Sequence, residues 1–181
     1  MRYELTKDPG FQILNTTAND LQKVLWLFEQ AMDLQGKNGY MVWNSLDQLA
    51  LEKDIENGLQ YKIISRNDIV CIFSIQLSDP FIWRDRDHDD AIYLHRIVVH
   101  PDYKGQRQFE KVLKWAVNFG RQKNLKYVRM DTWADNEKII DYYKSFGFKF
   151  IEYYKTPDAP ELPFQNRNLH VALLELEIKE E

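Results

Sequence analysis

Residues 93–105 read YLHRIVVHPDYKG, and the prediction of the fold starts from this stretch. Its first half is apolar and β-branched, which predicts a strand over 92–99 that ends before Pro101. Apolar residues then recur at helical spacing, so a helix follows the strand. The helical stripe consists of Phe109, Val112, Leu113, Ala116 and Val117.

The same alternation continues toward the C-terminus. The patterns predict a strand at 127–133, a helix at 139–146 and a strand at 148–154. A Pro-rich loop at 157–163 leads to a last strand at 170–178. Strands that alternate with helices in this way imply right-handed crossover connections.

The N-terminal part predicts one strand and two helices. The strand covers 11–15, and the first helix runs from Thr17, which forms a capping-box pattern with Asp20, to about Gly36. The second helix covers 45–57.

A hairpin is predicted in the middle of the chain. Two β-branched runs, 59–65 and 69–77, flank a polar turn at 66–68. A polar loop over 79–90, which carries Trp83, then leads to the strand at 92–99.

The complete pattern predicts an α/β or α+β fold, with a mixed sheet and helices on its faces. The 181 residues favour a single domain over 1–181. With 44% hydrophobic, 14% aromatic and 29% charged residues, the chain has the composition of a globular protein with one core. Because no apolar stretch approaches the ~20 residues of a membrane span, and no signal-peptide core is present, we expect a cytoplasmic protein without a membrane partner.

Composition and missing motifs argue against several other classes. A net charge of -4 gives nucleic acid no electrostatic attraction. One cysteine, Cys71, and four histidines without zinc-ligand spacing lead us to expect no metal. The glycines form neither the dinucleotide nor the triphosphate phosphate loop, and G-x-S-x-G is absent.

Two motifs carry a resemblance to a known family. Residues 93–105, running into a helix near Arg107, resemble the acetyl-CoA-binding core of the GNAT N-acetyltransferase superfamily. Residues 136–148, NEKIIDYYKSFGF, are similar to the family pattern N-x-x-A-x-x-x-Y-x-x-x-G-F, with Ile139 in place of the alanine. The resemblance implies a GNAT-like fold with about 6–7 strands and about four helices, an acetyl-CoA-binding core over about 91–154, and acetyl-CoA as cosubstrate.

The pyrophosphate loop of the family, [QR]-x-x-G-x-[GA], falls on residues 104–109. The resemblance implies cofactor binding by Lys104, Gly105, Gln106, Arg107, Gln108 and Phe109. Arg107 and Phe109 replace the two small residues of the pattern, although backbone N–H groups at a helix N-terminus attract an anion without needing glycine. Two alternatives stay open: the bulky side chains crowd the diphosphate, or Arg107 gives it a guanidinium partner.

The resemblance also implies that a central strand splays from its neighbour. The pantetheine arm of the cofactor would pair with the exposed backbone of Ile97, Val98 and Val99. Asn136 lies where the family often contacts the cofactor. Its alternative role, with Asp135, is the N-cap of the following helix.

Tyr143 matches the tyrosine that protonates the departing thiolate in many relatives. The alternative is a core tyrosine, because its spacing is helical. Tyr142 lies ~100° away around the helix and is expected to point elsewhere.

His95 falls where some family members carry a glutamate or histidine general base. Strand alternation, before any bulge, places Tyr93 and His95 on one face and Leu94 and Arg96 on the other. The alternative role of His95 is that of a hydrogen-bonded structural residue.

Several other side chains have less specific patterns. His88 lies among four aspartates and two arginines, which is typical of a solvated loop rather than a metal site, although that acidic loop could attract a cationic amine. Trp43, Trp83 and Trp133 could line a substrate pocket or pack in the core.

Together these features predict an N-acetyltransferase that moves an acetyl group directly from acetyl-CoA to a primary amine of a small molecule or peptide. Catalysis is assigned to Tyr143 and His95. One alternative is a catalytically inactive binding module with this fold, and another is an acyltransferase that uses a different acyl-CoA. The aromatic residues and the last strand favour a homodimer.

Overall fold

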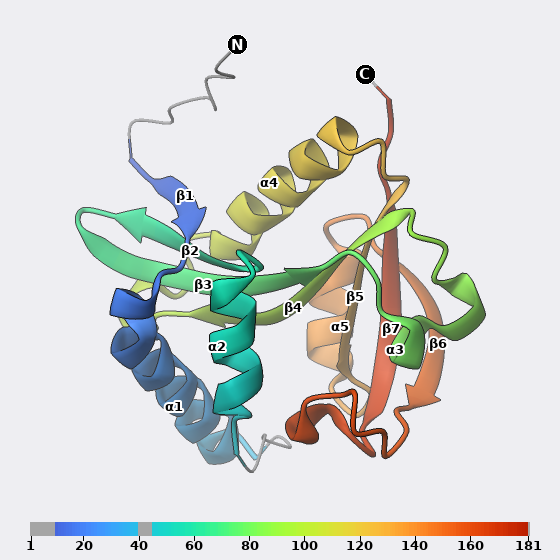
Figure 1. The fold of residues 1–181 in the computed structure, drawn as a ribbon, viewed down its shortest axis with the longest axis horizontal. Coiled ribbons are helices and arrows are strands. Elements are labelled where there is room, and N and C mark those ends of the chain that lie inside the picture. The colour runs from blue at the N-terminus through green and yellow to red at the C-terminus, as the bar shows by residue number, and fades with distance from the viewer. Residues whose placement is uncertain (1–9, 40–44, 181) are drawn as a thin grey trace.

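The structure, a computed structural model, describes residues 10–39 and 45–180. It contains a seven-stranded sheet with the order β1-β2-β3-β4-β5-β7-β6, flanked by helices on both faces (Figure 1). The strands are β1 (Gln12–Asn15), β2 (Gln60–Ser65), β3 (Asp68–Gln76), β4 (Ala91–Val99), β5 (Tyr127–Trp133), β6 (Lys149–Lys155) and β7 (His170–Glu177). The helices are α1 (Leu21–Lys37), α2 (Gln48–Glu56), α3 (Pro80–Trp83), α4 (Gln108–Gln122) and α5 (Glu137–Lys144).

The prediction of a mixed sheet is confirmed. β4 and β5 are parallel, and every other neighbouring pair is antiparallel. The parallel pair is connected through α4, which is the crossover that the alternation of strand and helix predicts. All the predicted strands and the four predicted helices are present.

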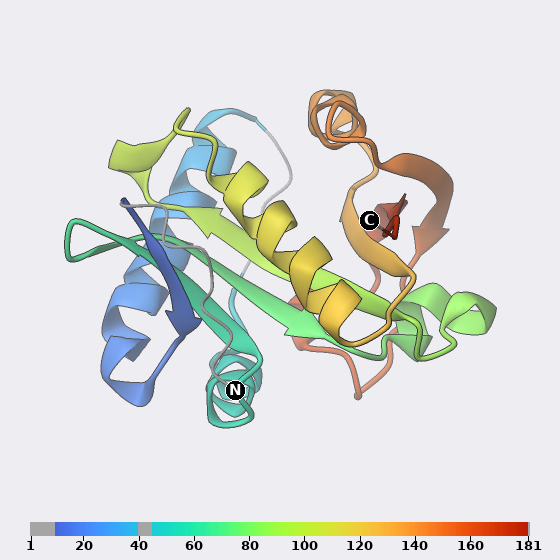
Figure 2. The ribbon, with the colours of Figure 1, turned by 90° about the horizontal axis from the view of Figure 1, so that it is seen from above.

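One face of the sheet is covered by α4 and α5 (Figure 2). The apolar stripe predicted for α4 is buried there, together with Ile140 and Tyr143 of α5, against residues of β3, β4, β5 and β7. α4 therefore joins the two halves of the sheet from one side.

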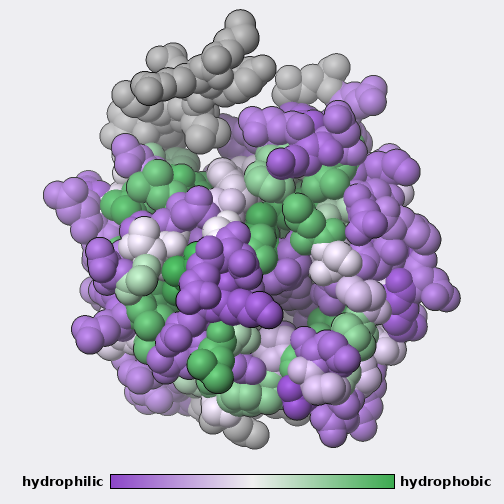
Figure 3. Space-filling view, in the orientation of Figure 1, coloured by the Kyte–Doolittle hydropathy of each residue, from purple (hydrophilic) through white to green (hydrophobic). Residues whose placement is uncertain are grey.

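The opposite face carries two separate groups of side chains. Over β3 and β4, residues of α1 and α2, such as Phe28 and Leu51, pack on Ile72 and Val98. Farther along the sheet, α3 and the loop that precedes β7 pack on the start of β4 and on β7. The space-filling view, in the orientation of Figure 1, shows mixed polar and apolar residues around a recess near the centre (Figure 3).

The prediction of a polar loop over 79–90 is wrong in part, because this segment contains α3 and a 3-10 turn over 84–86. Pro80 begins α3, where its fixed φ suits the first helical turn. Ile82 and Trp83 are buried, and the Arg129 guanidinium lies 4.8 Å from the centre of the Trp83 ring. Trp83 is thus a core residue, while Trp43 lies outside the described residues.

A β-bulge interrupts β4. Ile72 pairs with Val98 and Ser74 pairs with His95, so β4 has one residue more than β3 over this interval. Arg96, inside the bulge, has a φ of 50°, in the left-handed region. The predicted alternation of faces therefore ends here, and His95 and Arg96 line the same two cavities.

No helix within 10–39 and 45–180 is long and apolar enough to cross a membrane.

Candidate active site

The sheet opens between β4 and β5. The two strands pair from Ala91 opposite Tyr127 to Leu94 opposite Met130, and no pair between them continues in the described residues beyond that point. The second half of β5 pairs with β7 instead. The splay that the family resemblance implies is therefore present.

The segment predicted to pair with the cofactor lies on this open edge. Val98 packs toward α1 and α2, whereas Ile97 and Val99 pack against the core under α4. Since these side chains point to the two faces of the sheet, it is the backbone of β4 that borders the opening. Pairing of this backbone with a cofactor stays a prediction.

A cavity of about 110 Å³ occupies the opening. It is lined by His95 of β4, Asp131 and Trp133 of β5, and Tyr143 of α5. The structure therefore brings together the two predicted catalytic residues, which are 48 positions apart in the sequence. Of the two roles predicted for Trp133, lining a pocket or packing in the core, the structure shows the first.

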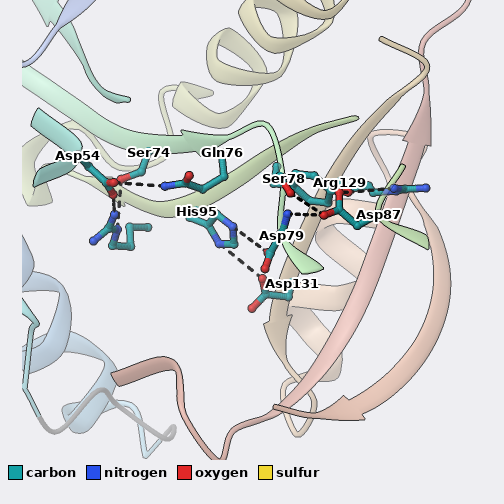
Figure 4. A network of polar contacts seen from close by, with 11 residues as sticks. Asp54, Ser74, Gln76, Ser78, Asp79, Asp87, His95, Arg129 and Asp131 are labelled. Atoms are coloured by element: carbon teal, nitrogen blue, oxygen red, sulfur yellow. Dashed lines mark hydrogen bonds and ion pairs between the residues drawn. The ribbon is translucent and has the colours of Figure 1, made fainter. Parts of the chain in front are cut away.

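His95 lies between two carboxylates (Figure 4). Its Nε2 is 3.2 Å from Asp79 Oδ2, and its Nδ1 is 3.6 Å from Asp131 Oδ1. Burial acts to lower the pKa of His95, but Asp79 and Asp131 outweigh this effect and hold the pKa above its ordinary value. An imidazole in this position accepts a proton more readily than a free histidine.

Asp131 is the second perturbed group of the cluster. Burial raises the pKa of Asp131 to about 6, although the neighbouring His95 acts to lower it. Since His95 and Asp131 interact, their protonation belongs to the pair rather than to either residue. The cluster can therefore take up a proton near neutral pH.

Tyr143 reaches the cavity from the middle of α5. It is 9% exposed, and its ring lies 4.8 Å from that of Phe109, edge to face. Burial raises the pKa of Tyr143, so the phenol stays protonated and can donate a hydrogen bond at neutral pH. Tyr142 is 45% exposed, in agreement with the expectation that it points elsewhere.

The loop before α4 has an unusual backbone. Gly105 and Arg107 have φ values of 72° and 56°, both in the left-handed region. A Cβ added to Gly105 would meet no atom within 4 Å, so the space beside it is open. The Arg107 side chain is 76% exposed, and its Nε lies 2.5 Å from Glu110 Oε2.

Phe109 points away from this loop. It is 4% exposed and packs in an aromatic cluster with Tyr142, Tyr143, Phe146 and Phe148. Its ring therefore contributes to the core beneath α4. Gln108, also buried, accepts a hydrogen bond from Lys111, whereas Lys104 and Gln106 are exposed.

Asn136 is the N-cap of α5. Its Oδ1 accepts a hydrogen bond of 3.1 Å from the Ile139 N–H. This is the structural alternative considered for the residue, and contact with a cofactor stays a prediction.

The cluster of Asp79, His95 and Asp131 also has the donor atoms of a cation site, all within 4.8 Å of one another. The ion pairs of His95 with both carboxylates account for this arrangement without a metal. Our expectation of a metal-free protein stays a prediction.

Sequence reasoning missed Asp79, Asp131 and the environment of Arg96. Asp131 lies in a predicted strand and Asp79 is the first residue of a predicted loop, and neither belongs to a motif that indicates a partner for His95. Asp54 of α2 holds Arg96 Nη2, a contact between helix and sheet that no local pattern reveals. The only available signal was that both aspartates lie next to apolar segments that have to be buried.

The structure thus combines a sheet that is split between two parallel strands, titratable groups at the split, and a helix N-terminus near its open end. These features are those of the family that the sequence resembles. The model of the acetyltransferase (GNAT) family matches residues 28–148, more than half of the chain. The chain belongs to the acetyltransferase (GNAT) family. The prediction of an enzyme of the acyltransferase class is thereby confirmed.

Individual relatives agree with this assignment. The uncharacterized N-acetyltransferase YesJ of Bacillus subtilis is 23% identical over 150 residues, which cover 78% of this chain and 83% of YesJ. A GNAT-family acetyltransferase from Listeria monocytogenes has a similar structure, with a TM-score of 0.76, 20% identity and coverage of 92% and 94% of the two chains. YncA, a putative acetyltransferase from Salmonella typhimurium solved with acetyl-CoA, gives a TM-score of 0.64 at 15% identity and covers 95% of this chain and 96% of its own.

Proposed function

We propose that the protein is an N-acetyltransferase that transfers an acetyl group from acetyl-CoA directly to a primary amine. The observation that carries this proposal is the meeting of His95, Asp131 and Tyr143 in the cavity where β4 and β5 separate. Membership of the acetyltransferase family supports the reaction class, and the YncA structure with acetyl-CoA supports the donor.

The residues present fit this cosubstrate. The open edge at Ile97, Val98 and Val99 offers backbone groups to the amides of a pantetheine arm. The loop from Lys104 to Phe109 leads into the N-terminus of a 15-residue helix, whose free N–H groups favour a diphosphate. The open space beside Gly105 and the inward position of Phe109 favour binding over crowding.

Acetyl-CoA supplies an activated thioester carbonyl. A backbone N–H near Val98 would stabilise the oxyanion that develops on this carbonyl. His95 would take the proton from the acceptor's ammonium group, a removal that costs ~4 to 5 kcal/mol at pH 7 for an amine of ordinary pKa. The Tyr143 O–H would donate a hydrogen bond to the thiolate that leaves.

Thermal unfolding with excess acetyl-CoA is the first test of this function. A ligand at ~100 times its Kd adds about 2.7 kcal/mol of apparent stability, so the Tm rises by several degrees. Equal concentrations of longer acyl-CoA thioesters and of ATP are the controls. No shift with any thioester would overturn the proposal in favour of an inactive binding module, and a shift with longer thioesters alone would replace acetyl-CoA as the donor.

We also propose a single domain over the whole chain, a cytoplasmic location and a homodimer, without nucleic acid or membrane as partner. Composition supports the first two of these proposals. The exposed aromatic residues Phe150 and Tyr153 on the edge strand β6 support the third.

A further inference from the structure

A second cavity, of about 380 Å³, lies between α2 and α3 and shares His95, Arg96 and Asn166 with the first. Lys53 and Asp54 line it from α2, Pro80 and Phe81 from α3, and Glu161 from the loop before β7. An acceptor bound in this second cavity would lie next to His95, which also lines the cavity at the β4–β5 opening. Its charges therefore bear on what the acceptor is.

Arg96 is held rigidly in the wall shared by the two cavities. Its Nη2 donates to Asp54, and its Nε donates to Ser74 Oγ at 3.2 Å. The side chain is 5% exposed, and burial lowers its pKa to about 10, which leaves it a cation at neutral pH. The guanidinium is fixed in its orientation before any acceptor binds.

The second guanidinium nitrogen of Arg96, Nη1, is buried and has no hydrogen-bond partner among residues 10–39 and 45–180. The carboxylate of Asp54 does not contact it: Oδ1 accepts from Gln76 and Oδ2 accepts from Arg96 Nη2. A buried donor without an acceptor lowers the stability of the folded protein, and the effect is larger when the donor carries a charge. A ligand that supplies an oxygen acceptor to this nitrogen would therefore bind favourably. A carboxylate suits a guanidinium best.

The opposite charge lies on the other side of His95. Figure 4 shows Asp54, Ser74 and Gln76 on one side of the imidazole and Asp79 and Asp131 on the other. Lys53 adds a positive charge from α2, and Glu161 adds a negative charge from the loop before β7. The α2 side therefore carries the positive charges of Arg96 and Lys53 against the one negative charge of Asp54, whereas Asp79 and Asp131 bring negative charge to the other side of His95.

We infer that the acceptor is an amino acid, bound with its carboxylate toward Arg96 Nη1 and its amine toward His95 and the two carboxylates. His95 and Arg96 are consecutive residues, so they suit an amine and a carboxylate that are close together in one molecule. Leu59, Phe81, Ile82 and Leu162 give the cavity an apolar wall, which fits an apolar side chain. This inference rests on the proposed function and names its substrate class.

Matched acceptors test the inference with acetyl-CoA and a free-thiol assay. Each set contains an amino acid, its amide and its decarboxylated amine: leucine with leucinamide and isoamylamine, and phenylalanine with phenylalaninamide and phenethylamine. We expect the free amino acid to have a kcat/KM about tenfold or more above its decarboxylated partner. Equal values for the three members of each set, or no turnover of any amino acid while another amine is acetylated, would overturn the inference and leave the acetyltransferase proposal standing.

An Arg96→Lys variant localises the preference. Lysine keeps a charge for Asp54 but lacks the second donor nitrogen, so the ratio of kcat/KM for the amino acid to kcat/KM for its decarboxylated amine should fall toward one. Thermal unfolding checks the fold of this variant. If it does not fold, the paired change Arg96→Gln with Asp54→Asn, which removes both charges of this buried pair, replaces it.

Calorimetric titration of the wild-type protein with leucine and with isoamylamine gives a readout that needs no turnover. Binding of leucine alone supports an amino-acid site at Arg96 even if acetyl-CoA fails to bind, in which case the proposed function falls and the amino acid is a ligand rather than an acetyl acceptor. Equal binding of both compounds, or binding of neither, contradicts the amino-acid assignment.

Discussion

At the scale of single residues, the proposed role of His95 as a base depends on how its imidazole is surrounded. Two carboxylates contact its two ring nitrogens, and both come from segments other than its own strand. Each negative charge favours the imidazolium form. The environment therefore raises the pKa of His95 and makes it a stronger base than a free imidazole. For the same reason, His95 stays protonated, and unable to accept a proton, up to a higher pH.

This effect gives a prediction for pH dependence. In the proposed mechanism the cluster has to be deprotonated, so kcat/KM should rise with pH through the apparent pKa of the cluster, above the ordinary histidine value of about 6.5. Asp131→Asn removes a charge that raises the pKa of His95, so this rise should move to lower pH. The measurement is the pH profile of kcat/KM for both proteins.

The matched control is Asp141→Asn on α5, whose carboxylate is 75% exposed and pairs with Lys144. Its pH profile should equal that of the wild type. A profile of Asp131→Asn that falls in height without moving along the pH axis would contradict the assigned role.

The two neighbouring tyrosines give a second prediction. Tyr143→Phe keeps the ring in its aromatic cluster and removes only the O–H that faces the cavity, so kcat/KM should fall about tenfold or more with little change in Tm. Tyr142→Phe, at the exposed position, should retain the wild-type rate. Steady-state thiol release measures both, and equal rates for the two variants would remove Tyr143 from the mechanism.

At the scale of elements, α4 combines a core face with a loop of left-handed backbone at its N-terminus. Phe109 belongs to the core, so its size serves packing rather than filling the space before the helix. Phe109→Ala should therefore lower the free energy of unfolding by ~3 to 5 kcal/mol without tightening acetyl-CoA binding. Urea denaturation and calorimetric titration measure the two effects.

Lys114→Ala, on the exposed side of the same helix, is the control and should change the free energy of unfolding by no more than about 0.5 kcal/mol. A clear gain in acetyl-CoA affinity for Phe109→Ala would show that the phenylalanine crowds the diphosphate after all.

The extent of sequence-based prediction also differs by element. The strand 92–99 and the helix after it were predictable, because their apolar residues follow one period over many positions. α3 was not, because four residues with Phe81, Ile82 and Trp83 are too few to establish a helical period. The bulge at Arg96 depends on how β4 pairs with β3, and the Asp79–His95–Asp131 cluster combines three separate segments. Neither feature can be predicted from a local sequence pattern.

At the scale of the whole molecule, the contact between Asp54 and Arg96 ties α2 to the bulge of β4. Asp54→Ala would leave the Arg96 guanidinium buried without its carboxylate, which should lower the free energy of unfolding by ~3 to 5 kcal/mol. Glu56→Ala, at an exposed position of the same helix, should change it by no more than about 0.5 kcal/mol. Equal stability of the two variants in urea denaturation would mean that Arg96 finds another partner.

The split between β4 and β5 has a consequence for aggregation. An unpaired strand edge attracts other polypeptide chains, and most proteins must protect the edges at the outside of their sheets. Here an unpaired edge lies in the middle of the sheet, flanked by α4 on one face and by α1 on the other. Because helices lie on both faces beside it, this edge is less accessible to a second protein strand than an edge at the outside of the sheet. A slender chain that carries a few amide groups needs less space, so the fold can admit such a ligand while it shields the edge from neighbouring proteins.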